Sequence, residues 1–207
     1  MSGRLSEGTG GVTESLKNRV IMPLTGSYGA TDHVLGHELV HAFQYNIAQG
    51  RAGAGLQGLM MLPLWLVEGM AEYLSVGRDD PLTAMWLRDA IRREDLPTIK
   101  QMTTETRFFP YRFGEALWAF VGGKYGDEQI VDLYRRSLRV GWHPAIEPVL
   151  GATSDSLSAE CRDPVEAEYL PLMPGRQAPG EAGALPLAPS TGAGHQNVPP
   201  SVSPDGR

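Results

Sequence analysis

Two histidines and a glutamate interrupt an otherwise uncharged stretch, VLGHELVHAF, at positions 34–43. His37 and His41 are four residues apart, so on a helix they lie on one face, one turn from each other. Their imidazole rings can then bind the same metal ion, with Glu38 beside a water molecule on that ion. Buried imidazole and carboxylate groups without partners would cost free energy. The stretch therefore predicts a buried helix with a metal site; the alternative is a core helix whose histidines only form hydrogen bonds.

The helix around this stretch is predicted to run from about residue 31 to 48, with Thr31 or Asp32 as its N-cap. His33 lies one turn before His37 and could also approach the metal. We interpret His33 as a polar residue of the first helical turn rather than as a ligand.

A second apolar stretch, LWLVEGMAEYL at positions 64–74, carries Glu68 and Glu72 on one helix face. Zinc is bound by imidazole nitrogen and carboxylate oxygen, and a catalytic zinc site has three protein ligands. We therefore predict one Zn²⁺ per chain, bound by His37, His41 and Glu68. Glu72 is interpreted as the acceptor of the free ring N–H of a ligand histidine, His37. The alternative is that both glutamates are solvated on an outer helix face.

Together the two stretches resemble the gluzincin metallopeptidases, in the peptidase MA-like group that combines H-E-x-x-H with W-x-x-E-G-x-A-E-Y. The matching residues are His37, Glu38, His41, Trp65, Glu68, Gly69, Ala71, Glu72 and Tyr73. The resemblance spans about residues 20–138 and implies a zinc metallopeptidase with a zincin-like, mostly helical α+β fold. Gluzincin aminopeptidases place the third ligand closer to the second histidine and carry a G-x-M-E-N motif, which residues 1–36 lack. The resemblance therefore does not extend to aminopeptidase activity.

Tyr111 and Gly114 match a Tyr-x-x-Gly pattern. In gluzincins, to which the chain is similar, such a tyrosine supplies a phenol that stabilises the tetrahedral oxyanion, a role suited to an O–H donor in a dry site. The alternative is an aromatic ring packed under a loop. Arg112 is expected either to bind a substrate carboxylate or to form a surface salt bridge.

The predicted function is hydrolysis of peptide bonds in a peptide or protein substrate. Glu38 would take a proton from a zinc-activated water and pass it to the leaving amine. One alternative is a non-catalytic, zinc-stabilised interaction module attached to a β-propeller; Glu38 argues against it, because a structural zinc site needs no general base. Another alternative is hydrolysis of a non-peptide amide or ester.

Composition excludes several other classes of protein. The net charge of −6 and the lack of basic runs argue against a nucleic-acid partner. A single cysteine, Cys161, excludes an intrachain disulfide and a cysteine-rich zinc site. No apolar run reaches the roughly 18 residues of a membrane span, and the first residues lack the apolar core of a signal peptide. The resemblance favours a periplasmic or extracellular protein, and we expect the chain to begin inside a longer one.

Three parts are expected along the chain: a flexible, Gly- and Ser-rich segment at residues 1–18, the peptidase MA-like domain at 19–170, and a disordered linker at 171–207. Residues 19–24 predict a short edge strand, because Pro23 lacks an N–H. This strand either pairs with extended substrate near the metal or is an ordinary edge strand.

Further helices are expected over about residues 81–93, 97–102, 113–125, 128–139 and 154–170. Residues 49–58 are expected to form a loop. Ser154 or Asp155 is the expected cap of the last helix, which Pro164 should limit, and His143 is expected in a loop.

The linker prediction rests on 8 Pro and 6 Gly among residues 171–207, a content above the roughly 25–30% that marks low-complexity chain. The final residues, VSPDGR at 202–207, resemble the turn that opens the blades of TolB-like propellers. They predict either a following propeller or a chance match to a common turn.

Overall fold

The computed structural model describes residues 10–17, 19–24, 26–50, 55–177 and 180–183. The chain divides into two units, Met1–Leu172 and Met173–Arg207. The described residues of the second unit form turns. In one of them the amide of Arg176 donates a hydrogen bond to the carbonyl of Met173 at 3.1 Å. Most of the predicted linker, including the propeller-like turn at residues 202–207, lies outside the described residues.

The first unit is a mostly helical α+β arrangement, as expected. Strands β1 (Val12–Glu14) and β2 (Arg19–Ile21) form an antiparallel hairpin in which Thr13 is opposite Val20. The helices are α1 (Tyr28–Gln49), α2 (Gly55–Met60), α3 (Leu64–Val76), α4 (Pro81–Arg92), α5 (Ile99–Thr104), α6 (Pro110–Tyr125), α7 (Asp127–Val140), α8 (Trp142–Leu150) and α9 (Ser154–Tyr169), with a 3₁₀ turn η1 (Leu170–Leu172). Within these ranges, no helix is long and apolar enough to cross a membrane.

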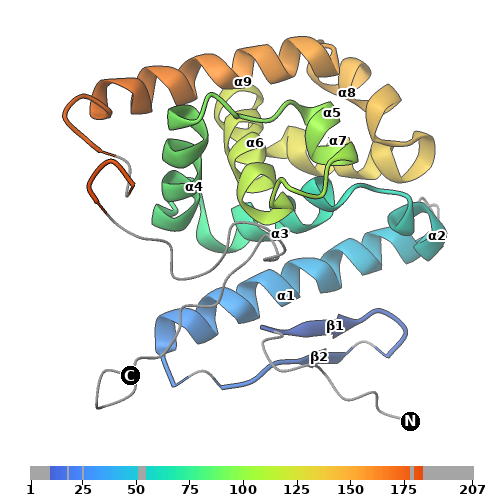
Figure 1. Ribbon diagram of the computed structural model, residues 1–207. Helices are drawn as coiled ribbons and strands as arrows, with labels where there is room; N and C mark the ends of the chain where they lie inside the picture. The colour runs from blue at the N-terminus through green and yellow to red at the C-terminus, as the bar shows by residue number, and fades with distance from the viewer. Residues whose placement is uncertain (1–9, 18, 25, 51–54, 178–179, 184–207) are drawn as a thin grey trace. The chain divides into compact units, whose positions relative to one another are not determined.

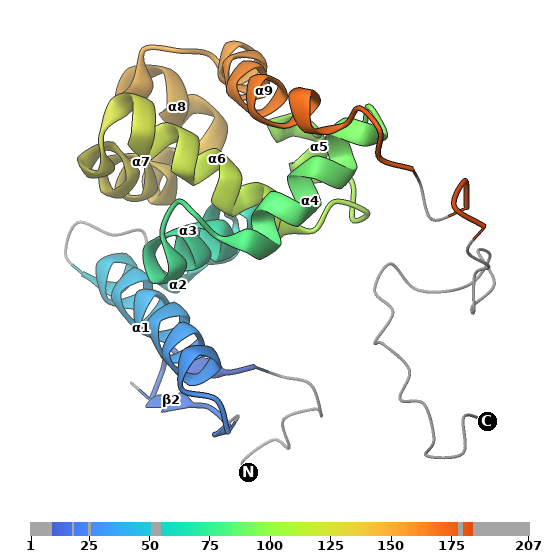
Figure 2. The ribbon, with the colours of Figure 1, turned by 90° about the vertical axis from the view of Figure 1, so that its left-hand side faces the viewer.

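Helix α3 lies between α1 on one side and α6 on the other (Figures 1 and 2). Its side chains are buried on most sides, including Trp65, Leu66 and Met70. The prediction of a buried helix over residues 64–74 is therefore confirmed. Because α3 carries both predicted site glutamates, this central position brings them into the interior of the first unit.

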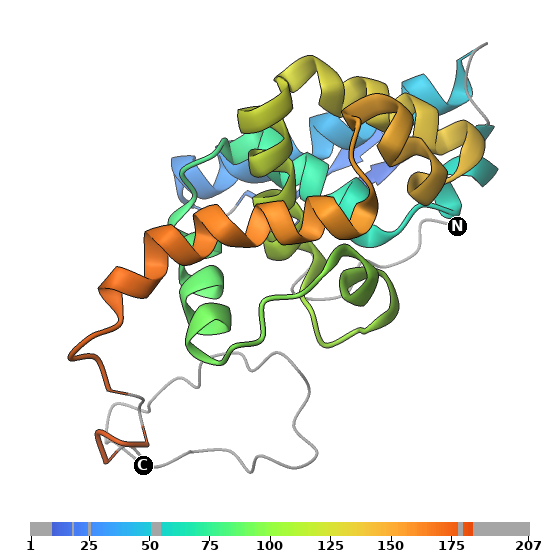
Figure 3. The same cartoon turned by 90° about the horizontal axis from the view of Figure 1, so that it is seen from above.

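The hydrophobic core continues from α3 into the C-terminal helices. The indole N–H of Trp118 in α6 donates to the carbonyl of Leu66 at 3.1 Å, and the phenol of Tyr134 in α7 donates to the carbonyl of Gln44 in α1 at 2.9 Å. Helix α9 packs against α4, α5 and α8, and Figure 3 shows it running across the top of these elements. The two hydrogen bonds tie α6 to α3 and α7 to α1, so the C-terminal helices help to fix α1 and α3 relative to each other.

Two glycines set the distance between α3 and α6. A Cβ built on Gly69 would overlap the backbone of Gly114, and a Cβ built on Gly114 would overlap the carbonyl of Trp65. The helices can approach this closely only because neither residue has a side chain. The first turn of α6, one turn before Gly114, thereby reaches the acidic face of α3.

Several local expectations about the N-terminal region are wrong. Residues 1–18 were expected to be flexible, yet Val12–Glu14 forms β1, because it pairs with β2 and packs on α1. The predicted strand over residues 19–24 is shorter and ends at Ile21. The cap of α1 is Ser27 rather than Thr31 or Asp32, since its hydroxyl accepts a hydrogen bond from the amide of Ala30 at 3.4 Å.

Further corrections concern the loops and the later helices. Part of the expected loop over residues 49–58 is α2, and the expected loop around His143 is the first turn of α8. Pro164 lies inside α9, and Thr153 caps that helix in place of Ser154 or Asp155. Helix α6 begins at Pro110 rather than near Phe113, since proline is favoured in a first turn.

Candidate metal centre

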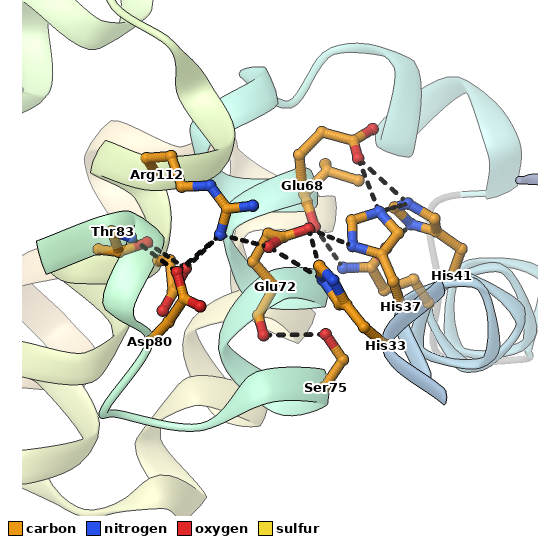
Figure 4. A network of polar contacts seen from close by, with 12 residues as sticks. His33, His37, His41, Glu68, Glu72, Ser75, Asp80, Thr83 and Arg112 are labelled. Carbon is orange, nitrogen blue, oxygen red and sulfur yellow. Dashed lines mark hydrogen bonds and ion pairs between the residues drawn. The ribbon is translucent and has the colours of Figure 1, made fainter. Parts of the chain in front are cut away.

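Helices α1 and α3 bring three predicted ligand atoms together. Nε2 of His37 lies 3.1 Å from Nε2 of His41, and Oε2 of Glu68 lies 3.3 Å and 3.2 Å from these two nitrogens. Figure 4 shows both rings on α1 facing the carboxylate on α3. Both histidines are buried, so two of the three atoms belong to side chains that are largely removed from water.

The partners of the opposite ring nitrogens fix which nitrogen carries hydrogen. Gln44, 1% exposed, donates from its amide nitrogen to the carbonyl of Val67 at 2.9 Å, so its amide oxygen faces Nδ1 of His41 at 2.8 Å. Nδ1 of His41 must therefore donate. Nδ1 of His37 lies 2.9 Å from Oε1 of Glu72; this contact is an ion pair without hydrogen-bond geometry, and its proton still belongs on the nitrogen that faces the carboxylate.

Both Nε2 atoms consequently present lone pairs toward each other and toward Glu68 when the rings are neutral. Three electron-rich atoms at this spacing repel one another unless they share a positive charge. The pKa values of the groups follow the same logic. Burial opposes charge on His37, but Glu68 and Glu72 raise its pKa to about 9. Burial likewise opposes charge on Glu68, but His37 and His41 lower its pKa to about 2.

The donor set and its spacing fit zinc. Donor atoms about 2.0–2.1 Å from a tetrahedral zinc are about 3.3 Å from one another, close to the observed 3.1, 3.2 and 3.3 Å. Two imidazole nitrogens and one carboxylate oxygen also form a donor set typical of catalytic zinc. His37, His41 and Glu68 are thus the residues that would hold the ion.

Glu72 occupies the place predicted for it beside His37, and three cationic or donating groups surround its carboxylate. Nε2 of His33 lies 3.2 Å from each oxygen, and Nη1 of Arg112 lies 2.8 Å from Oε2 (Figure 4). Burial opposes charge on Glu72, but His33, His37 and Arg112 lower its pKa well below its ordinary value. The glutamate is buried and ionised, not solvated on an outer face.

Arg112 does not have either of its expected roles. Its side chain is 11% exposed, and Nη1 also lies 3.0 Å from Oδ2 of Asp80 and 3.2 Å from Oε2 of Glu115. A guanidinium shared by three buried carboxylates is neither a surface salt bridge nor available to a substrate carboxylate. The earlier start of α6 is the reason, because it places Arg112 in the first helical turn, against α3.

Glu38 projects from α1 toward the N-terminal hairpin. The hydroxyl of Thr13 in β1 lies 2.6 Å from Oε2 of Glu38 and 2.9 Å from the carbonyl oxygen of Glu38. On its other side, a Cβ built on Gly11 would lie 2.6 Å from Oε1. The hairpin therefore fixes the orientation of this carboxylate.

An open cleft of about 380 Å³ reaches the three-atom cluster at His37. Its lining includes Gly10 and Gly11 ahead of β1, His37 and Glu38 on α1, and Tyr111 on α6. Among the residues that the structure describes, none of β1 or of β2 lines the cleft, so a role of the strand at residues 19–24 in binding substrate stays a prediction. The cleft gives a substrate access to the predicted base and phenol together.

Tyr111 stacks on the ring of His37, with ring centroids 5.7 Å apart and planes 13° from parallel. Burial and the charge of Glu68 raise the pKa of the Tyr111 phenol above its ordinary value. The phenol therefore keeps its proton at neutral pH and can donate a hydrogen bond. Tyr111 lies on the cleft rather than under a loop.

Sequence reasoning missed Gln44 and Thr13 and assigned no contact to His33. Gln44 had a detectable signal: it is a polar residue three positions after His41 on an apolar helix, so it shares a face with that ligand. Thr13 had no detectable signal of a role in the site, because it lies in a segment whose composition predicted a flexible chain.

Comparison with protein-family profiles, with curated proteins and with solved structures gave no significant match to this chain.

Proposed function

We propose that this chain is a zinc-dependent metallopeptidase of the gluzincin type, with a zincin-like arrangement of its two site helices. One observation carries the proposal: His37, one of the three clustered donors with His41 and Glu68, lines a cleft together with Glu38 and Tyr111. A structural zinc site is closed by four protein ligands, whereas a catalytic site keeps a position for water or substrate. The arrangement therefore favours catalysis over a purely structural role.

A Zn²⁺ ion bound by the three donors would acidify a water molecule and polarise the carbonyl oxygen of the scissile bond. Glu38 takes a proton from the attacking water while the oxygen of that water bonds to the carbonyl carbon. Glu38 then delivers that proton to the amide nitrogen as the C–N bond breaks, and the second proton of the water also passes to the amine, so the products are a carboxylate and an ammonium group. Thr13 keeps the carboxylate of Glu38 in place during both transfers.

Tyr111 stabilises the charge that develops on the carbonyl oxygen. Its phenol is protonated at neutral pH and lies on the cleft, so its O–H can turn from Glu68 to donate to that oxygen. Stacking on His37 fixes the direction of the ring relative to the cluster. The substrate class proposed is a peptide or protein.

The test compares Glu38→Gln with the wild type and with Glu147→Gln, a change at an exposed glutamate on α8. We expect about one zinc per chain in all three proteins. Peptide hydrolysis should fall by about 10²–10⁴-fold in Glu38→Gln alone. Glu68→Ala should lose most of its zinc.

Undiminished hydrolysis in Glu38→Gln would exclude the proposed mechanism. A wild-type chain that binds no zinc would exclude the metal centre. Zinc binding with no cleavage across a broad peptide library would leave the non-peptide amides and esters as substrates to screen.

A further inference from the structure

His33, Glu72 and Arg112 form an arrangement beside the zinc ligands that the proposed mechanism does not use. The imidazole Nε2 of His33 contacts both oxygens of Glu72 at 3.2 Å, while Arg112 contacts Oε2 at 2.8 Å (Figure 4). The remaining contact of Oε1 is Nδ1 of His37 at 2.9 Å. Both oxygens of the Glu72 carboxylate thus have cationic or donating partners.

The same atoms have the spacing of a second cation site. Donor atoms of His33, His37 and Glu72 lie within 4.8 Å of one another. Arg112, however, already supplies a positive charge to Glu72, and Asp80 and Glu115 hold its guanidinium in place. A divalent ion next to this fixed guanidinium would be repelled. The charge of Glu72 is therefore balanced by the protein itself.

The backbone of Glu72 is held as well. The hydroxyl of Ser75 donates to the carbonyl of Glu72 at 3.0 Å within α3. The helix fixes the backbone of Glu72, and Arg112 holds its carboxylate on one side. The carboxylate could still rotate away from His37. The contacts of His33 with both oxygens oppose that rotation.

We propose that His33 is a positioning residue of the metal centre: it holds the Glu72 carboxylate against Nδ1 of His37, so that Nε2 of His37 faces the metal. This inference rests on the proposed zinc site. His33 acts through Glu72 and is not itself a ligand. Mutation of the outer partners of ligand histidines typically lowers metal affinity by about 10–100-fold.

His33 is a better target than Arg112 for testing the arrangement. Replacing Arg112 would remove the cation that Glu72, Asp80 and Glu115 share, a change that strongly destabilises a folded protein. The side chain of His33 is 29% exposed at the rim of the cleft, so substitutions are tolerated more easily. His33→Leu removes the donor, His33→Gln keeps an N–H at similar reach, and Asp32→Asn changes an exposed neighbour on the same helix.

The measurement is zinc affinity in competition with a chromophoric chelator, together with zinc per chain and the visible spectrum of the Co²⁺-substituted proteins. We expect His33→Leu to bind one zinc about tenfold more weakly, with an altered Co²⁺ spectrum. His33→Gln should recover an affinity close to that of the wild type. Asp32→Asn should match the wild type in all three measurements.

Unchanged zinc affinity in His33→Leu would overturn the proposal. Two zinc ions in the wild type and one in His33→Leu would also overturn it, because His33 would then be a ligand. These readouts do not depend on hydrolysis. If the affinities follow the expected order but no peptide is cleaved, the peptidase function fails and the role of His33 stands.

Discussion

Gly69 of α3 and Gly114 of α6 meet backbone to backbone, at a separation that excludes a Cβ on either residue. This crossing places the first turn of α6, with Tyr111 and Arg112, against the turn of α3 that carries Glu68 and Glu72. The geometry of the candidate metal centre therefore depends on two residues that have no chemistry of their own.

Gly114→Ala should destabilise the protein by about 1–3 kcal/mol, because the added methyl group meets a helix backbone rather than a flexible side chain. Urea denaturation followed by circular dichroism measures the change in the free energy of unfolding. Gly123→Ala is the matched control on α6, since the nearest atom to its Cβ is a nitrogen of Arg78 at 3.8 Å. Equal stability of the Gly114→Ala protein and the wild type would contradict the packing argument.

Gln44→Leu should weaken zinc binding by about 10–100-fold, because Nδ1 of His41 loses the acceptor that orients the ring. Chelator competition measures the affinity. Asn46→Leu, an equivalent change at an exposed position of α1, is the control and should leave the affinity unchanged. The assigned orientation of His41 is wrong if the two variants bind zinc alike.

Gly11→Ala should lower peptide hydrolysis while leaving zinc affinity intact. The new Cβ would lie 2.6 Å from Oε1 and 2.7 Å from Cγ of Glu38, so the carboxylate must move away from its present position. Gly10→Ala is the control, because its Cβ meets only Cγ2 of Val34 at 3.9 Å. Loss of zinc in Gly11→Ala would show that the hairpin supports the ligands and not the base alone.

Tyr111→Phe should reduce kcat by about 10²–10³-fold, the usual effect of removing one oxyanion donor. Zinc affinity should be retained, because a phenylalanine ring keeps the stacking on His37. Tyr28→Phe, at an exposed position of the first turn of α1, is the control, and a kcat equal to that of the wild type in Tyr111→Phe would remove the phenol from the mechanism.

Glu115 should make stability depend on pH. Its carboxyl is 1% exposed and accepts a hydrogen bond from Thr83, while burial and the charges of Asp80 and Glu72 raise its pKa to about 7. The folded state therefore binds this proton more tightly than the unfolded state, whose pKa is near 4.5. The contribution of Glu115 to the free energy of unfolding is fully present below about pH 4.5. It is lost as the pH rises through about 7, and the loss is up to about 3 kcal/mol.

Glu115→Gln mimics the protonated carboxyl and should remove this dependence. Urea denaturation at fixed zinc concentration and several pH values gives the difference in the free energy of unfolding between the two proteins. That difference should shift in favour of Glu115→Gln between pH 4.5 and 7. A difference that is constant with pH would show that Glu115 is ionised in the folded protein throughout this range.

Local sequence was sufficient wherever a feature depends on spacing along one helix. The four-residue separations of His37 from His41 and of Glu68 from Glu72 put each pair on one face, whatever surrounds them. The apolar residues around Glu68 predicted burial, and the whole stretch at residues 64–74 lies within α3. The zincin-like fold and the peptidase activity stay predictions.

Sequence reasoning failed where a residue's role comes from another part of the chain. Residues 12–14 include two β-branched residues, but they lie in a Gly- and Ser-rich segment, and they form a strand because β2 and α1 pack against them. The sequence around Arg112 predicted a surface salt bridge or a contact with substrate. In the structure, the close crossing of Gly69 and Gly114 brings Arg112 among three carboxylates.

The sequence by itself determined the chemical groups of the candidate centre and the helix faces on which they lie, because helical periodicity is a property of the local chain. Only the tertiary structure decided that the donors of α1 and α3 converge to 3.2–3.3 Å. It also decided that Gln44 contacts His41, that His33 contacts Glu72 and that Thr13 contacts Glu38. Distances between helices depend on the sum of many packing contacts, which no short stretch of sequence encodes.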